Sequence, residues 1–224
     1  MSEVYEVDPA RPEAAGSAID AAADAIAAGL LVLFPTETVY GIATRPDDHA
    51  ATARLFEAKR RPPDLNLPVL AANASEAFGV ASATGPAERL AASFWPGPLT
   101  MVLRRTGRSS PWALGRRPDT IGVRVPDHAL SGLLLARSGP LAATSANLSG
   151  HPPVEDPEAL LATFGQGVAV YVVVAAGSKQ PKGTPSTVVD LTGERIRILR
   201  EEGIDRVHLM AAMAESGRAV DSLD

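Results

Sequence analysis

Residues 30–41 read LLVLFPTETVYG, an uninterrupted apolar run that gives way at once to hydroxyl and carboxylate side chains. The apolar part, LLVLF at 30–34, is typical of a short buried strand. The alanine-rich stretch 17–28 before it predicts a helix that begins at Ser17 as N-cap and stops at Gly29. Open α/β sheets usually bind their ligands where such buried strands end in polar groups.

The rest of the chain continues this pattern of apolar runs and amphipathic stretches. Their irregular alternation, with a tight turn at Thr192–Gly193 between two strands, favours a mixed parallel and antiparallel sheet over a purely parallel one. We predict an α/β fold with a single domain over 1–224, a core at about 17–203 and a flexible tail at 217–224. The other predicted strands are 67–72, 99–105, 120–125, 141–144, 168–175, 187–191 and 196–199. The other predicted helices are 47–59 (capped by Asp47 or Asp48), 86–94, 129–137, 157–164 and 205–215.

The composition limits the classes of function. The 224 residues are 46% hydrophobic but only 4% aromatic, so aliphatic side chains must fill the core. There is no cysteine and the four histidines are scattered, which excludes thiolate chemistry and argues against a resident zinc site. The N-terminal residues lack the regions of a signal peptide, and no apolar run reaches the roughly 18 residues of a membrane span. We expect a cytoplasmic protein without membrane contact, and the net charge of −5 confines any basic surface to a local patch.

Four short stretches place polar groups where predicted strands or helices end: PTETVYG at 35–41, AKRRP at 58–62, TIGVRVP at 120–126 and ATSANLSG at 143–150. The first and the last are also typical of ordinary turns capped by threonine or serine. AKRRP is also typical of a solvated basic helix end, which the helix dipole favours. In the functional interpretation, its lysine and its second arginine face a cleft and converge on a phosphate or a carboxylate.

Arg124 interrupts the apolar strand 120–125. It is either an edge residue that points to solvent or a fixed anion clamp, and we favour the clamp because a buried guanidinium needs a partner. The sequence contains neither a GxxxxGK[ST] nor a GxGxxG loop for phosphates, and no GxSxG turn for a serine nucleophile. The residues alone therefore indicate an α/β protein with a polar, cationic cleft for an anionic ligand.

In this order and spacing, the four stretches resemble the YrdC family, whose members make threonylcarbamoyl-adenylate for the t6A modification of tRNA. The resemblance runs from about residue 17 to residue 203 and also includes FWPGPLT at 94–100, PSTVVDLT at 185–192 and ILREEG at 198–203. It implies a strongly twisted, mixed parallel/antiparallel sheet flanked by helices, with a large concave and positively charged cleft. It also implies the short, single-domain form of the family, because the chain ends soon after the last of these stretches.

The resemblance assigns roles to individual side chains. The residues implied to contact L-threonine are Thr38, Arg124, Ser145 and Ser186. The residues implied to bind the nucleotide are Lys59, Arg61, Thr120, Asn147 and Arg200. Among these, Lys59 and Arg61 are the implied catalytic pair. No metal ligand is implied, because Mg2+ would be carried by the phosphates of ATP.

The implied enzyme is a nucleotidyltransferase, a threonylcarbamoyl-AMP synthase that uses L-threonine, bicarbonate and ATP and releases pyrophosphate. This reaction brings two anions together, so convergent lysine and arginine charge is its main requirement, with Mg2+ on the phosphates. The implied partners are a TsaD-type threonylcarbamoyl transferase downstream and a weak contact with tRNA.

Some positions depart from the family pattern. Arg60 replaces a glycine, and Leu65 and Leu70 stand where some members place polar groups, a histidine in the second case. These leucines leave a first alternative open, a family paralogue that makes a different carbamoyl-adenylate or transfers a carbamoyl group. A second alternative is a non-catalytic RNA-binding protein, which the acidic net charge and the scarce aromatic residues argue against. Its basic surface would consist of residues 59–61, Arg104, Arg105, Arg108, Arg116 and Arg117.

Overall fold

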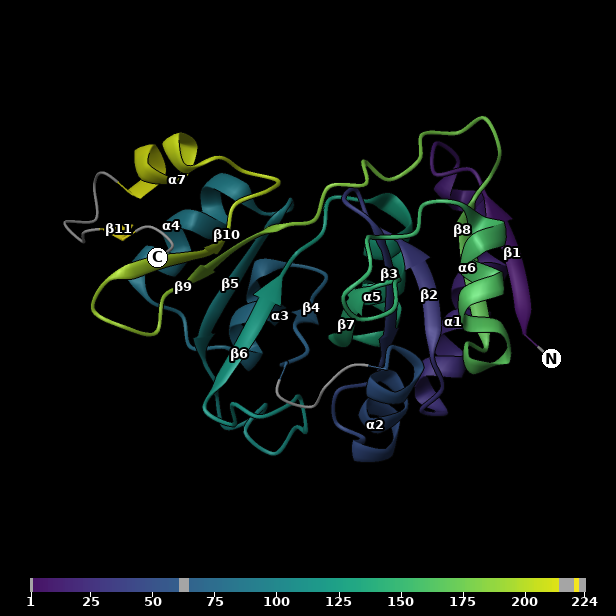
Figure 1. The fold of residues 1–224 in the computed structure, drawn as a ribbon, viewed down its shortest axis with the longest axis horizontal. Coiled ribbons are helices and arrows are strands. Elements are labelled where there is room, and N and C mark those ends of the chain that lie inside the picture. Colours follow the sequence, from purple (N-terminus) through teal and green to yellow (C-terminus); the bar gives the residue numbers. More distant parts are fainter. Residues whose placement is uncertain (1, 61–64, 214–219, 222–224) are drawn as a thin grey trace.

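One mixed sheet runs through the computed structural model, which describes residues 2–60, 65–213 and 220–221 (Figure 1). Its eleven described strands lie in the order β1, β8, β2, β3, β7, β4, β6, β5, β9, β10, β11. Five neighbouring pairs are parallel and five are antiparallel, which confirms the predicted mixed sheet. The strands are β1 (Glu3–Val7), β2 (Val32–Pro35), β3 (Tyr40–Thr44), β4 (Val69–Leu70), β5 (Leu99–Arg104), β6 (Thr120–Arg124), β7 (Leu141–Ser145), β8 (Val170–Val174), β9 (Thr187–Asp190), β10 (Ile196–Arg200) and β11 (Val220–Asp221).

Helices cover both faces of this sheet. Along the run that contains β2, Leu31 and Leu33 belong to one hydrophobic core, whereas Val32 and Phe34 belong to another. Alternate side chains of a strand point to opposite faces, so a strand without polar residues needs cover on both. Helices α1 and α5 supply residues to the second core, and the remaining α-helices of the described chain supply the first. The helices are α1 (Gly16–Ala27), α2 (His49–Ala58), α3 (Ala74–Val80), α4 (Gly85–Phe94), α5 (Ala129–Ser138), α6 (Pro157–Phe164) and α7 (Arg206–Met213).

The polar stretch after β2 is a tight hairpin turn, after which Tyr40 begins β3. The Thr36 hydroxyl donates to the Val39 carbonyl at 2.6 Å, and the Thr36 N–H donates to the same oxygen at 3.1 Å. The sequence predicted the turn but not β3, whose glycine and alanine residues weaken a strand pattern. Strand pairing overrides this local weakness, because β3 is hydrogen-bonded to β2 on one side and to β7 on the other.

A long connection carries the chain from β8 to β9 across the middle of the molecule (Figure 1). We call residues 175–186 the crossing segment. It is anchored on the hairpin turn, where the Gly183 N–H donates to the Thr38 carbonyl at 2.8 Å. Gly183 has a φ of +76°, a left-handed conformation that glycine adopts without strain.

Capping residues in the sequence correctly predicted the end of α1 and the start of α2, but not the start of α1. Gly29 follows α1 with a φ of +72°, and the Asp48 side chain caps α2 by accepting from the Ala50 N–H at 2.8 Å, both as predicted. Ser17 is not the N-cap of α1, because Ala15 holds that position without a side-chain hydrogen bond. A 3-10 turn leads directly into this helix, so a capping side chain is not needed to start it.

Three further elements were not predicted. β1 is a charged, alternating stretch that the parallel β8 recruits to the edge of the sheet, and α3 is only 7 residues long. β11 pairs with β10 inside the stretch expected to be a flexible tail. The rest of that stretch, 217–219 and 222–224, lies outside the described residues.

Replacing Asp48 with alanine removes the cap of α2. We expect the free energy of unfolding to fall by about 1 kcal/mol, because two N–H groups of the first turn lose their acceptor. Chemical denaturation measures this change. Asp20→Ala is the matched control, since the Asp20 side chain is 65% exposed in its ion pair with Arg137 and contributes less than about 0.5 kcal/mol. Equal losses in the two variants would contradict the capping role.

Candidate active site

Lys59, the C-cap residue of α2, is buried, with only 1% of its surface exposed. Its Nζ donates to Asn147 Oδ1 at 3.1 Å, to Thr144 Oγ1 at 3.3 Å and to the Ser145 carbonyl at 2.5 Å. ATSANLSG therefore supplies three oxygens that accept hydrogen bonds from the ammonium group. The expectation that Lys59 faces an open cleft is thus wrong, because its charge holds the loop that follows β7.

Ser145 and Asn147 are joined to each other as well as to Lys59. The Ser145 hydroxyl donates to Asn147 Oδ1 at 2.5 Å, and Asn147 Nδ2 donates to the Leu148 and His151 carbonyls at 3.0 and 2.5 Å. The amide oxygen thus accepts from both a hydroxyl and an ammonium group, which determines the orientation of the amide. The structure therefore brings three of the predicted site residues into one hydrogen-bonded cluster.

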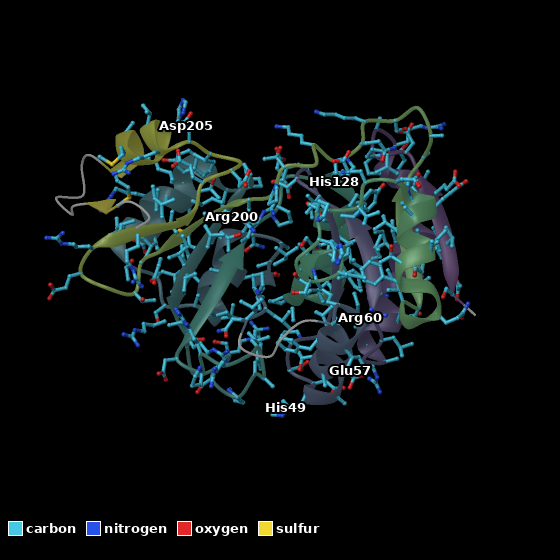
Figure 2. The ribbon with its side chains drawn as sticks, viewed as in Figure 1. His49, Glu57, Arg60, His128, Arg200 and Asp205 are labelled. Atoms are coloured by element: carbon cyan, nitrogen blue, oxygen red, sulfur yellow. The ribbon has the colours of Figure 1, made fainter. Side chains whose placement is uncertain are left out.

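Arg60 adopts a backbone conformation that glycine favours. Its φ is +48°, within the left-handed region, and its N–H donates to the Glu57 carbonyl at 2.9 Å. Figure 2 shows both residues at the end of α2. The arginine that replaces the family's glycine therefore keeps a turn that glycine would adopt without strain. Arg61, the next residue and a predicted catalytic cation, lies outside the described residues.

Arg124 ends β6, an interior strand, and is only 6% exposed. Its Nη2 donates to the Glu37 carboxylate at 2.7 Å and to Thr38 Oγ1 at 2.8 Å, and its Nε donates to the Gly97 carbonyl at 3.1 Å. Burial lowers the pKa of the Arg124 guanidinium and the Glu37 charge opposes that shift, so the group stays protonated. Arg124 is therefore not an edge residue that points to solvent, and the hairpin turn holds it in one geometry.

The two threonine hydroxyls of the hairpin turn form a chain of hydrogen bonds that ends at a backbone carbonyl. Because the Thr36 hydroxyl donates to the Val39 carbonyl, its oxygen must accept from the Thr38 hydroxyl, 2.8 Å away. The Thr38 oxygen in turn accepts from Arg124. This chain of hydrogen bonds ties the guanidinium to the backbone of the turn, and a buried network with all members satisfied is rigid.

Arg200, from β10, is held in a similar way. Its Nε donates to the Ser186 carbonyl at 2.8 Å and its Nη2 to the Ser186 hydroxyl at 3.2 Å, while that hydroxyl lies 2.9 Å from Thr100 Oγ1. Burial lowers the pKa of Arg200, the Glu202 charge raises it, and the Arg124 charge lowers it. The charges of the two guanidinium groups thus act on each other. Figure 2 shows Arg200 near the middle of the molecule.

Thr120 stands apart from these clusters. It begins β6, opposite Arg104 of β5, and is half-buried. Its carbonyl accepts from Arg105 Nε at 3.0 Å, and among the described residues no hydrogen bond joins it to Lys59, Arg124 or Arg200. Thr120 thus lies on the same strand as Arg124, four residues before that arginine.

Glu37 received no role from the sequence, although its carboxylate lies in the same motif as Thr38. It accepts from Arg124 through Oε1 and from the Asp127 N–H through Oε2, the latter at 3.1 Å. A usable signal was present: one carboxylate in a turn after a buried strand, and one arginine inside another strand. Each of these charges needs a partner when it is buried.

Two cavities lie away from these clusters. One of about 680 Å³ is lined by α2 and residues 113–116, and another of about 330 Å³ lies where α1 and α5 end. Neither is lined by the residues that hold Lys59, Arg124 or Arg200. Within the described ranges, no three His, Asp or Glu side chains gather as a metal site. The candidate site is therefore defined by the side chains around Lys59, Arg124 and Arg200, and not by either cavity.

The chain matches the family model named for the Sua5, YciO and YrdC proteins, described as telomere recombination, over residues 24–202. The protein belongs to this family. A relative from Mycobacterium tuberculosis is 42% identical over 201 residues, which are 89% of this chain and 90% of the relative. The threonylcarbamoyl-AMP synthase of Escherichia coli is 38% identical over 187 residues, which are 81% of this chain and 96% of that protein. The resemblance to the YrdC family is thus confirmed.

Solved structures of family members share the fold. P. abyssi Sua5 complexed with L-threonine has a TM-score of 0.78 and 31% sequence identity, over 100% of this chain and 65% of that one. E. coli YciO has a TM-score of 0.81 and 25% identity, over 93% of this chain and 100% of that one. The predicted fold class is confirmed, and the chain spans 65% of the length of the Sua5 chain.

Replacing Lys59 with alanine removes the buried ammonium group that donates to Thr144, Ser145 and Asn147. We expect a loss of about 2 kcal/mol in the free energy of unfolding, because hydrogen bonds from a charged donor are stronger than those between neutral groups. Chemical denaturation measures the loss, with Lys179→Ala as the control because Lys179 is exposed. A Lys59 variant as stable as the control would show that these hydrogen bonds do not hold the loop.

His128 makes stability depend on pH. Its Nδ1 accepts from the Leu130 N–H at 3.3 Å, and burial lowers its pKa while the Glu37 and Asp127 charges oppose that shift. A lowered pKa gives stability that is complete above the unfolded-state value of about 6.5 and is lost as pH falls through the folded-state value. We expect the free energy of unfolding to fall less between pH 7 and 5 in His128→Asn, which caps α5 without titrating. Parallel pH profiles of the two proteins would contradict this.

Proposed function

We propose that this protein is an L-threonylcarbamoyladenylate synthase, which makes threonylcarbamoyl-AMP and pyrophosphate from L-threonine, bicarbonate and ATP. The observation that carries the proposal is the fixed geometry of two arginines, buried Arg124 and exposed Arg200, each of which donates to protein groups through Nε and Nη2. Relatives named threonylcarbamoyl-AMP synthase and the L-threonine complex of P. abyssi Sua5 support the same activity. The product would serve the t6A modification of tRNA.

Arg124 is the proposed anchor of the threonine carboxylate. Its Nε and Nη2 donate to protein groups, whereas its Nη1 donates no hydrogen bond within the described chain. Hydrogen bonds from a guanidinium to a carboxylate are short, strong and directional. The other proposed contacts of the amino acid are the hydroxyl groups of Thr38, Ser145 and Ser186.

The proposed reaction has two steps. The threonine amine takes up the carbon of bicarbonate as a carbamate, with loss of water. A carbamate oxygen then attacks the α-phosphate of ATP, and the bond to the departing pyrophosphate breaks. Both reactants are anions, so positioning and positive charge supply most of the catalysis. The proposed nucleotide contacts are Lys59, Arg61, Thr120, Asn147 and Arg200, with Lys59 and Arg61 as the catalytic pair.

The hydrogen bonds of Lys59 support a double role. Its ammonium group keeps the Ser145 hydroxyl and the Asn147 amide in one orientation, and it also adds positive charge beside them. The described residues lack a cluster of three metal ligands, so we propose that Mg2+ enters on the phosphates of ATP. There it would neutralise phosphate charge and orient the α-phosphate.

The proposed partners follow from the product. An adenylate of this kind is consumed by a transferase, for which a TsaD-type threonylcarbamoyl transferase is the proposed candidate, with a weak contact to tRNA. We place the reaction in the cytoplasm, and no helix in the described part of the chain is long and apolar enough to cross a membrane. The continuous sheet supports a single domain over 1–224.

The paralogue with a different amine substrate is the second candidate, and Leu70 is the observation that favours it. Leu70 is 6% exposed and pairs directly with Arg124 across β4 and β6, so both side chains lie on the same face. An apolar residue therefore borders the proposed carboxylate anchor, where it would shape the amino-acid subsite. Leu65 is 44% exposed and lies at the surface.

The RNA-binding alternative loses part of its basic surface in the structure. Arg105 donates to the Ser109, Trp112 and Thr120 carbonyls at 3.1, 2.6 and 3.0 Å, so most of its donors are used inside the fold. An arginine that holds a loop together in this way is poorly placed to neutralise a phosphate. Catalysis remains the better interpretation.

Pyrophosphate release by the purified protein with ATP, Mg2+ and bicarbonate tests the proposed function. We expect release to depend on L-threonine and on bicarbonate. Release that responds to another amino acid would establish the paralogue, and tRNA binding without any pyrophosphate release would establish the RNA-binding protein. An inactive protein that binds neither ATP nor threonine would refute the proposal.

Replacing Arg124 with lysine keeps a positive charge but removes the planar fork. We expect the threonine KM to rise about tenfold or more, because the carboxylate loses a directed, charge-assisted hydrogen bond. The KM for ATP should change by less than about twofold, since that ligand is assigned to other cations. Arg137→Lys is the control, with a side chain that is 61% exposed. An unchanged threonine KM would make Arg124 a structural residue.

A further inference from the structure

Two arginines, buried Arg124 and exposed Arg200, are held by the same pattern of donors. In both Arg124 and Arg200, Nε donates to a backbone carbonyl and Nη2 donates to a side-chain hydroxyl. Nη1 of each arginine donates no hydrogen bond to a described residue. Neither of these two atoms is among the buried polar atoms that lack a partner, so each Nη1 is accessible to solvent. Each guanidinium therefore presents one nitrogen, with two N–H groups, to a ligand.

Glu37 distinguishes the two arginines. Its carboxylate accepts from Arg124 Nη2 at 2.7 Å, with 7% of the arginine side chain and 15% of the glutamate side chain exposed. Arg200 has no carboxylate within hydrogen-bond distance among the described residues, and Glu202 acts on it only through its charge. The charge of Arg124 is therefore compensated by a carboxylate in direct contact, whereas Arg200 contacts no carboxylate among the described residues.

The position of Glu37 leaves its carboxylate little freedom. Its second oxygen accepts from the Asp127 N–H at 3.1 Å, and its backbone carbonyl accepts from the Lys182 N–H of the crossing segment at 3.2 Å. Both carboxylate oxygens and the backbone are thus used within the protein. A ligand that binds Arg124 therefore lies close to the negative charge of Glu37, because that carboxylate is fixed in position.

We propose that Glu37 is a specificity-determining residue, which makes the Arg124 subsite accept a singly charged carboxylate and reject phosphate. This inference rests on the proposed function. Glu37 and Thr38 occupy both N–H groups of Nη2, so the two-nitrogen edge that would grip a phosphate is closed. A phosphate also carries more negative charge than a carboxylate and is repelled more strongly by Glu37. Phosphate is thereby directed to Arg200, where the acceptors are neutral.

Glu37→Gln tests this directly, because it removes the charge while keeping the shape. Its single carbonyl oxygen can accept from Arg124 or from the Asp127 N–H, but not from both. We expect inorganic phosphate to compete only with ATP in the unchanged protein and to compete with L-threonine also in the variant. The threonine KM should rise about tenfold and the ATP KM by less than about twofold, since one charge-assisted hydrogen bond orients only the amino-acid subsite.

Glu202→Gln is the matched control. It removes the same charge near Arg200, and Glu202 makes no side-chain hydrogen bond with a described residue. We expect it to leave the threonine response and the phosphate competition unchanged. If Glu37→Gln also leaves both unchanged, the inference is overturned. If that variant does not fold, Glu37→Asp separates the two effects: it keeps the charge, so it should raise the threonine KM without admitting phosphate.

A binding measurement keeps the inference separate from the proposed reaction. Nitrogen-15 NMR of the arginine side chains, assigned with Arg124→Lys, follows both guanidinium groups during titration with inorganic phosphate. We expect phosphate to shift the Arg200 signals alone in the unchanged protein and the signals of both arginines in Glu37→Gln. A protein without threonine-dependent pyrophosphate release that still shows this difference would lose the proposed function but retain the inference. Phosphate shifts at Arg124 in the unchanged protein would refute the inference, whatever the activity.

Discussion

A guanidinium inside a protein must find acceptors, and Arg124 imposes this constraint on several parts of the chain. Its acceptors come from the loop before β5 and from the hairpin turn after β2. The same turn receives the crossing segment through the Lys182 and Gly183 N–H groups. One buried charge therefore joins segments that are far apart in the sequence, and the proposed carboxylate subsite forms around it.

Lys59 and Arg124 represent two ways to stabilise a buried cation. Lys59 donates to hydroxyl, amide and carbonyl oxygens of the loop that follows β7. Arg124 has a carboxylate partner, which compensates the charge and directs the guanidinium. The Arg124 arrangement suits a ligand with one negative charge.

The structure shows where the three residues that depart from the family pattern lie. Arg60 occupies a left-handed conformation with a φ of +48°, where glycine is the favoured residue. Leu70 borders Arg124 on the same face of the sheet, and Leu65 lies at the surface. Of these three, only Leu70 adjoins the proposed amino-acid subsite. Selectivity for the amine substrate therefore depends on the environment of that side chain.

The sequence by itself determined the α/β class, the mixed sheet, most helices and strands, and the polar stretches that supply the site. Those features depend on local patterns of apolar residues, caps and turns, which a single segment contains. Only the tertiary structure decided that Lys59 is buried, that Glu37 pairs with Arg124, and that β3 forms. Arg124 and Glu37 are 87 positions apart, and Lys59 and Asn147 are 88 apart. Such pairs form because the order of the strands brings buried charges to acceptors from other segments, and no local pattern encodes that order.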